Sequence, residues 1–417
     1  MQSQIVAGQT DDTPRKGVCL HYLDWLRVLA ILFVFVYHSS RFFNMEDWHV
    51  KNPTWYPWVE VWNRFATTWM LPLIFVISGA SLFYAVGKGG GGTHAVGKFV
   101  KDKALRLLVP LAMCDFTHAS LQVYLERLSH GQFSGSYFQF LPHYFQGVYD
   151  ESNPASGNFA VTGMHLWYLF WLFLFSIILY PLLRWLKGGG RGALSRLGDL
   201  LALPGAVYAL ALPTLLLLTL ANPSGPVMAQ EEGGWSVVIY LWLLLAGFVV
   251  VSHDRLQASI QRLRWPSLPV ALVLAGLVIF LVGLGEGPAF GTPRFALAFG
   301  LRALSSWCFI VAILGFGRKH LNFSTPFLKY ANEAVLPFYI LHQTVLLCVG
   351  YLVVQWAIPD LLKWAIILPA SFAVIVALYE FLVRRFNVMR FLFGMKPLAK
   401  QPAAQPQEAA PAARPNV

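Results

Sequence analysis

Asp24, Arg27 and His38 are ionisable residues inside the first long apolar segment, residues 19–43. Arg27 and His38 are eleven residues apart, about three turns of a helix, so both should lie on one helical face. A charged side chain at the bilayer centre costs roughly 2.5 kcal/mol or more, so charges there indicate a functional site. His38 is the candidate for proton transfer, because imidazole titrates near neutral pH. For Asp24 and Arg27 the alternative is an ion pair that snorkels to the membrane interface.

The composition is typical of a protein built from membrane-spanning helices. Hydrophobic residues make up 57% of the chain and charged residues 12%, and the mean hydropathy is +0.55. Soluble domains carry roughly 25% charged residues. Apolar runs near twenty residues long predict an all-α polytopic bundle of about ten transmembrane helices. They fall near residues 22–42, 64–86, 104–124, 166–186, 201–221, 235–251, 267–284, 296–316, 334–355 and 361–383.

The distribution of charge predicts the orientation of this bundle. With the N-terminus in the cytoplasm, most of the 31 basic residues fall on the cytoplasmic side. The positive-inside rule therefore predicts two cytoplasmic termini in a multi-pass protein of the inner membrane. This topology accounts for the net charge of +11, so we expect no nucleic-acid partner. We expect a cytoplasmic tail at 1–18, a membrane domain at 19–395 and a disordered cytoplasmic tail at 396–417.

Other patterns in the chain favour structural roles. The glycine-rich stretches 87–98 and 187–192 lack the spacing of a nucleotide fingerprint and predict flexible linkers. The four cysteines show no paired spacing, so we expect neither a metal site nor disulfides. The outer loop at 125–164 mixes aromatic and polar residues, which suits a lid over a sugar. Interfacial aromatic residues account for that composition equally well.

Several stretches resemble the integral-membrane acyltransferase 3 family. The helix LDWLRVLAILFVFVYHSS has its arginine and histidine, and Ser78 and Gly79 match the Ser-Gly pair of the second span. Lys103 and Arg106 match the basic pair that opens the third span, although the first of that pair is more often arginine. Further stretches resemble the branch of glucan succinyltransferases called glucans biosynthesis protein C. These are residues 47–52, 165–169, 322–347 and 378–397.

The resemblance implies that an acyl group, succinyl or acetyl, passes from cytoplasmic acyl-CoA to a hydroxyl of a periplasmic or surface glycan. His38 would act as the base or become acylated as a relay, and the sequence leaves both routes open. Arg27 would orient the thioester or help to bind CoA. Lys103 and Arg106 would hold the CoA phosphates, with plain positive-inside bias as the alternative explanation of these charges.

The candidate acceptor site combines histidines with neighbouring aromatic residues, a pairing that suits a sugar. Its members are His49, Trp48, His165, Trp167 and His342. Interfacial anchoring and helix packing are the alternatives for these residues. The rival function is a secondary transporter without covalent chemistry, which would also place Arg, Asp and His within the membrane. Transporters commonly show internal repeats, and we find no convincing repeat in this chain.

Overall fold

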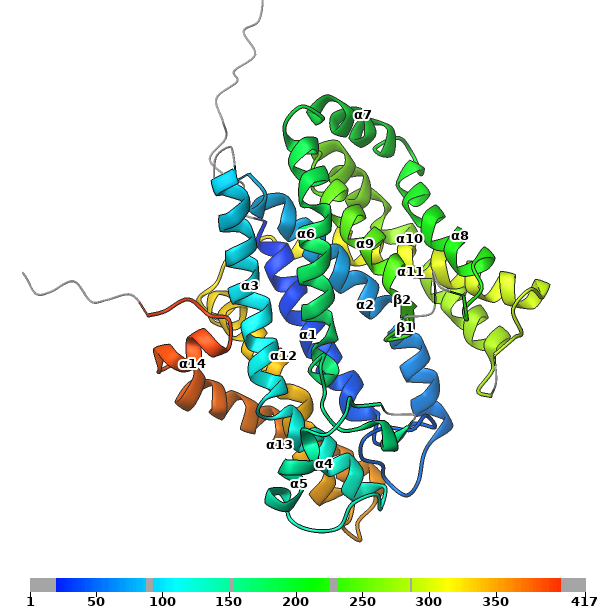
Figure 1. Cartoon of the computed structure of the whole chain (residues 1–417). Coiled ribbons are helices and arrows are strands. Elements are labelled where there is room, and N and C mark those ends of the chain that lie inside the picture. The colour runs from blue at the N-terminus through cyan, green and yellow to red at the C-terminus, as the bar shows by residue number, and fades with distance from the viewer. Residues whose placement is uncertain are drawn as a thin grey trace, which may run out of the picture.

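The computed structural model describes residues 20–87, 93–150, 153–225, 228, 231–285 and 287–398. These residues are helical and irregular apart from two isolated bridges between 147–148 and 157–159 and one short antiparallel ribbon, in which β1 (Glu231–Glu232) pairs with β2 (Trp235–Ser236). Figure 1 shows one helical bundle with α7 at one end and α4 and α5 at the other. Residues 88–92 and nearly all of both predicted tails lie outside the described residues, so the predictions made for them stay predictions.

Seven helical segments are long and apolar enough to cross a membrane, so the protein is a multi-pass membrane protein. An eighth span results if α7 (Arg191–Leu201) is joined with η3 (Ala206–Ala211) and α8 (Leu212–Leu220), across a bend of 113°. The seven are α1 (His21–Ser40), α2 (Pro57–Ala85), η2 (Met164–Leu166) with α6 (Trp167–Lys187), α10 (Asp254–Val282), α11 (Pro293–His320), α12 (Pro326–Val353) and α13 (Asp360–Leu378) with η4 (Tyr379–Val383).

The ten predicted spans all overlap helices, but besides the bent region of α7 and α8, two of the spans overlap helices that fail the test for a membrane span. The helix α9 (Val237–Val250) is apolar but only 14 residues long. The helix α3 (Thr93–Asp115) begins well before the predicted 104–124 and ends within it, and α4 (Ala119–Ser129) follows as a separate helix. The prediction of one helix over 104–124 is therefore wrong. Apolar residues continue across the turn at 116–118, and hydropathy alone cannot detect such a turn.

The predicted outer loop at 125–164 also has structure of its own. It contains the end of α4, the helix α5 (Tyr137–Tyr144) and the short turn η1 (Pro154–Ser156). In the C-terminal part of the described chain, α14 (Asn387–Leu392) follows η4 and contacts α3.

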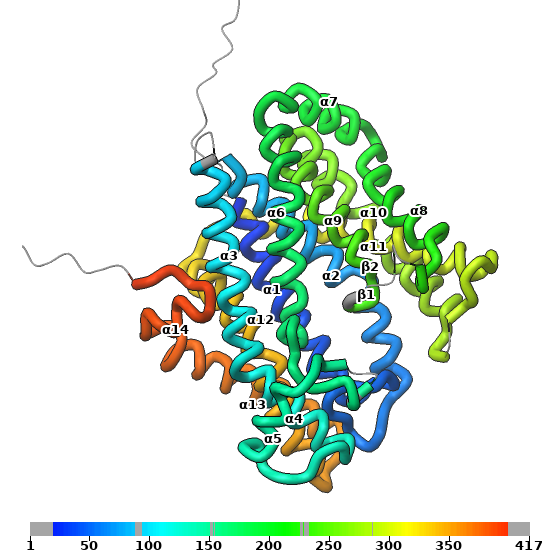
Figure 2. Tube along the Cα trace, viewed as in Figure 1, coloured from blue at the N-terminus to red at the C-terminus, as the bar shows by residue number. Residues whose placement is uncertain are grey.

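The helix α1 lies inside the bundle, where it contacts α2, α11, α12 and α13; Figure 2 shows its position. The neighbouring pair α2 and α9 approach each other closely at two glycines. A Cβ on Gly79 would lie 1.8 Å from the carbonyl oxygen of Leu244, and one on Gly247 would lie 2.0 Å from that of Val76. Only glycine allows this approach, which fixes the part of α2 that carries Ser78.

The loop between α1 and α2 is held in place by Lys51. Its Nζ donates hydrogen bonds to the backbone oxygens of Arg41, Asn44 and Glu46 and to Oδ1 of Asn44, at 2.7–2.9 Å. Burial, with the Arg41 guanidinium nearby, lowers the pKa of Lys51 to about 8. These bonds define the path of the loop on which Trp48 and His49 lie.

Candidate functional site

Two cavities lie along α1, one toward each end of the bundle. The larger, of about 860 Å³, is called here the histidine cavity because His38, His49 and His165 line it. The smaller, of about 260 Å³, is called the arginine cavity because Arg27 and Arg106 line it, together with Lys103. Four residues line both cavities and form the wall that they share: Ile31, Ile74, Tyr168 and Tyr339.

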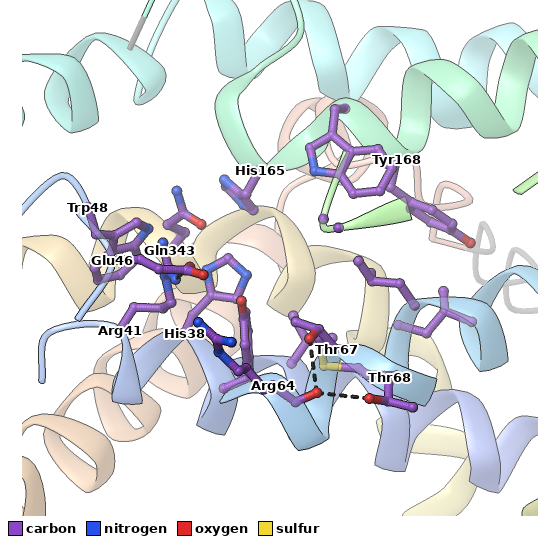
Figure 3. Close-up of a pocket in the computed structure, with 18 of the residues that line it drawn as sticks. His38, Arg41, Glu46, Trp48, Arg64, Thr67, Thr68, His165, Tyr168 and Gln343 are labelled. Atoms are coloured by element: carbon purple, nitrogen blue, oxygen red, sulfur yellow. Dashed lines mark hydrogen bonds and ion pairs between the residues drawn. The ribbon is translucent and has the colours of Figure 1, made fainter. Parts of the chain in front are cut away.

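His38 lies on the wall of the histidine cavity, in the last turn of α1. Its ring centre is 5.1 Å from that of His342 and 6.0 Å from that of Trp48. Nδ1 of His38 is buried and has no hydrogen-bond partner among the described residues. Figure 3 shows His38 near Gln343 and His165, with Trp48 and Arg41 on the same side of the cavity. A partly exposed imidazole with this freedom is suited to proton transfer.

The backbone carbonyl of Tyr339 determines the tautomers of two further histidines. It lies 2.6 Å from Nδ1 of His342 and 3.1 Å from Nε2 of His165. A carbonyl oxygen only accepts, so both of these nitrogens carry the hydrogen in neutral rings. The opposite nitrogens are buried without partners among the described residues. His165 lines the cavity, whereas His342 is 0% exposed and is not among the lining residues.

His49 has a carboxylate partner that the sequence analysis missed. Nδ1 of His49 hydrogen-bonds to Glu126 of α4, which also accepts from the hydroxyl of Tyr149 at 2.9 Å and from Arg127 at 3.1 Å. Burial would raise the pKa of Glu126, but the hydrogen bond from His49 and these other partners outweigh it and hold that pKa below its ordinary value. Glu126 is therefore ionised at neutral pH.

Other polar side chains of the histidine cavity also escaped prediction. Arg41 pairs with Glu46 in the outer loop, and Arg64 of α2 pairs with Glu60 at 2.8 Å. Gln343 follows the predicted His342 directly in the chain and lines the cavity. The signal for Arg64 and Glu60 was present in the sequence, because two ionisable residues one turn apart precede an apolar run.

At the opposite end, the Arg27 guanidinium is fixed by three partners. It donates to Asp24 at 2.9 Å, to Asn332 at 3.0 Å and to the hydroxyl of Ser81 at 2.7 Å. The ion pair considered for Asp24 and Arg27 is therefore present, and Arg27 nevertheless lines the arginine cavity. Lys103 and Arg106 reach the same cavity from α3.

The two cavities thus bring together most of the residues selected from the sequence. Besides the three histidines, Trp48 and Trp167 line the histidine cavity. Ser78 lines the arginine cavity, and its hydroxyl lies 2.6 Å from that of Tyr168 on the shared wall. Lys98 is exposed on the first turns of α3, on a helix and not in the predicted linker. The described residues contain no cluster of His, Cys, Asp and Glu that could hold a metal ion.

Comparison with known proteins identifies the family of this chain. The family model described as "Acyltransferase domain" (acyltransferase 3) matches residues 20–380. Glucans biosynthesis protein C of Escherichia coli (strain K12 / DH10B) is 21% identical over 408 residues, which cover 91% of this chain and 96% of that protein. The protein of the same name from Salmonella typhi is 21% identical over 402 residues, with the same two shares, 91% and 96%. No solved structure matches the chain. Because the family model spans most of its length, this protein belongs to the acyltransferase 3 family and is a membrane acyltransferase.

Proposed function

We propose that this enzyme transfers a succinyl or acetyl group from cytoplasmic acyl-CoA to a hydroxyl of a periplasmic or cell-surface glycan. The observation that carries the proposal is the pair of cavities along α1, one lined by Arg27, Lys103 and Arg106 and the other by His38, His49 and His165. Family membership favours this function over the secondary transporter, since the family is one of acyltransferases. The glucan acceptor is supported by the name of the relatives alone.

The arginine cavity suits the phosphate groups of CoA. Lys103 and Arg106 stand three residues apart on α3, so both point to one side of that helix, and Arg27 faces them from α1. Guanidinium groups bind phosphate through paired, charge-assisted hydrogen bonds. In the predicted topology, the end of the bundle with the arginine cavity faces the cytoplasm. The proposal keeps that topology, which is a ten-span protein of the inner membrane with both termini in the cytoplasm.

The distance between the two ends favours direct transfer. Arg27 and His38 are eleven residues apart on one regular helix, which is roughly 16 Å along its axis. The pantetheine arm of CoA has a comparable length when extended. A CoA molecule with its phosphates at Arg27 therefore presents its thioester near His38, past Ile31 and Ile74 on the shared wall. Arg27 then binds the donor and does not contact the reacting carbonyl.

In this geometry His38 acts as the general base on the acceptor hydroxyl. The hydroxyl proton moves to His38 while the hydroxyl oxygen bonds to the thioester carbon, and the CoA thiolate leaves. Positioned proton transfer of this kind contributes typically 10²–10⁴-fold to the rate. Trp48, Trp167 and His165 offer the aromatic faces and imidazole groups that bind a sugar on the same cavity wall.

Proteoliposomes with the protein in one orientation test the proposal. Acyl-CoA is supplied only at the face that carries Lys103 and Arg106, and a glucan only at the other face. We expect free CoA to appear on the donor side and acylated glucan, identified by mass spectrometry, on the acceptor side. Intact acyl-CoA after prolonged incubation would contradict the proposed reaction. Acylation only when both substrates share one side would contradict the crossing.

A further inference from the structure

A buried carboxylate on α4 begins a chain of side chains that ends beside His38. Glu126 is 1% exposed and accepts the hydrogen bond from Nδ1 of His49. Nε2 of His49 lies 3.1 Å from Nε2 of Gln343 on α12. Gln343 and His38 both line the histidine cavity, and Figure 3 shows these two side chains at the same wall of it.

The hydrogen bonds fix the orientation of each group in the chain. A carboxylate only accepts, so Nδ1 of His49 carries the hydrogen, and Nε2 of neutral His49 accepts from the Gln343 amide. The second N–H of that amide donates to Oε1 of Gln122 at 3.1 Å. Both N–H bonds of Gln343 are thus engaged, and its Oε1 is buried without a partner among the described residues. Gln343 therefore offers an oriented acceptor oxygen at the cavity.

The missing partner of that oxygen is on His38, whose Nδ1 is also buried and without a partner in the described part of the chain. We propose that Oε1 of Gln343 accepts a hydrogen bond from Nδ1–H of His38 and so selects the tautomer in which Nε2 is the base. Gln343, His49 and Glu126 are then positioning residues, none of which the sequence analysis assigned to this role. The inference rests on the proposed function, because it needs His38 to act as the base.

The role of the chain follows from the transfer step. The glycan hydroxyl gives its proton to Nε2 of His38, its oxygen bonds to the thioester carbon, and a tetrahedral intermediate forms. The carbon–sulfur bond then breaks, and the CoA thiolate takes the proton from Nε2. Between these events His38 is an imidazolium ion, held through Nδ1–H by Gln343. The negative charge of Glu126, three hydrogen bonds away, stabilises that ion in a low-dielectric site.

The test compares variants of Gln343 in oriented proteoliposomes, with succinyl-CoA or acetyl-CoA as donor and glucan as acceptor. Gln343→Leu keeps the volume and removes the acceptor oxygen. We expect kcat to fall roughly 10- to 100-fold, the usual effect of losing an orienting partner, with the KM for acyl-CoA unchanged within about twofold. Gln343→Glu keeps an acceptor oxygen and should recover most of the lost rate. A purely structural role predicts neither the unchanged KM nor this recovery.

Gln355→Leu is the matched control. Gln355 follows α12, is exposed, donates to the backbone oxygen of Tyr351 at 2.6 Å and lines neither cavity. We expect its kcat within about threefold of wild type. An unchanged kcat in Gln343→Leu, or equal losses in the Leu and Glu variants, would overturn the inference. So would a loss confined to His342→Asn, because the orienting acceptor would then be Nε2 of His342. A wild-type protein that transfers no acyl group would instead overturn the proposed function.

Discussion

Replacing His38 by alanine should abolish most catalysis while leaving the fold and the donor site intact. Removal of a general base lowers the rate typically 10²–10⁴-fold, which corresponds to about 2.7–5.4 kcal/mol on the activation free energy. The structural loss is smaller. His38 is only partly buried, its Nδ1 has no hydrogen-bond partner among the described residues, and its ring contacts Tyr37, Trp48 and His342. We expect the free energy of unfolding to change by about 1 kcal/mol.

Binding of the CoA phosphates should be unaffected, because Arg27 of the arginine cavity lies roughly 16 Å from His38 along α1. The assay measures release of free CoA and the mass of the acylated glucan, with protein amounts matched by quantitative blotting. Binding of a non-hydrolysable acyl-CoA analogue is measured in parallel. His320→Ala is the control, since His320 is exposed in the last turn of α11 and lines neither cavity. Activity of His38→Ala within about threefold of wild type would refute the role of His38 as base.

Three further predictions address the donor site, the shared wall and the His49 pair. Arg106→Ala should weaken acyl-CoA binding about tenfold, which is the effect of losing one charge-assisted hydrogen bond. Replacing the exposed Lys98 by alanine should change the affinity less than twofold. Calorimetric titration measures both affinities, and equal values would mean that positive-inside bias alone explains these basic residues. Ile74→Trp fills the shared wall past which the proposed pantetheine arm runs, so it should stop acyl transfer and weaken acyl-CoA binding, and a variant that still transfers at the wild-type rate would exclude this route. Glu126 has its folded pKa below its ordinary 4.5, so its contribution to stability is complete above about pH 4.5 and is lost as the pH falls through the folded value. The thermal midpoint in detergent should therefore drop in acid, and Glu126→Gln should lower the neutral-pH midpoint and flatten this dependence.

The relation between Arg27 and His38 could be predicted because it depends on helix geometry alone. Both lie on one regular 20-residue helix, and the period of 3.6 residues fixes their relative direction. The same local rule predicts that Lys103 and Arg106 share a face of α3, and both line the arginine cavity. Local spacing was sufficient wherever a single helix carries the residues.

The approach of His49, Glu126 and Gln343 could not be predicted in this way, because three separate segments meet there. Their contact depends on the turn at 116–118, which redirects the chain into α4, and on the loop that Lys51 holds. Helix periodicity also leaves the rotation of α12 undetermined. Neighbouring residues differ by about 100°, and as a result Gln343 faces the cavity while the predicted His342 is buried behind it.

The wall shared by the two cavities also bears on which acyl groups can react. It is formed by Ile31 and Ile74 with Tyr168 and Tyr339, and none of the four is an acidic or basic residue. An apolar or neutral acyl chain crosses such a layer at low cost, whereas a free carboxylate must be desolvated there. A succinyl group would therefore need a basic partner beyond the wall, and Arg41 and Arg64 line the histidine cavity. The transfer rates of an Arg41→Gln variant with succinyl-CoA and with acetyl-CoA distinguish the donors. A rate that falls only with succinyl-CoA identifies a contact between Arg41 and the succinyl carboxylate. Rates that fall equally with both donors indicate that Arg41 only stabilises the outer loop.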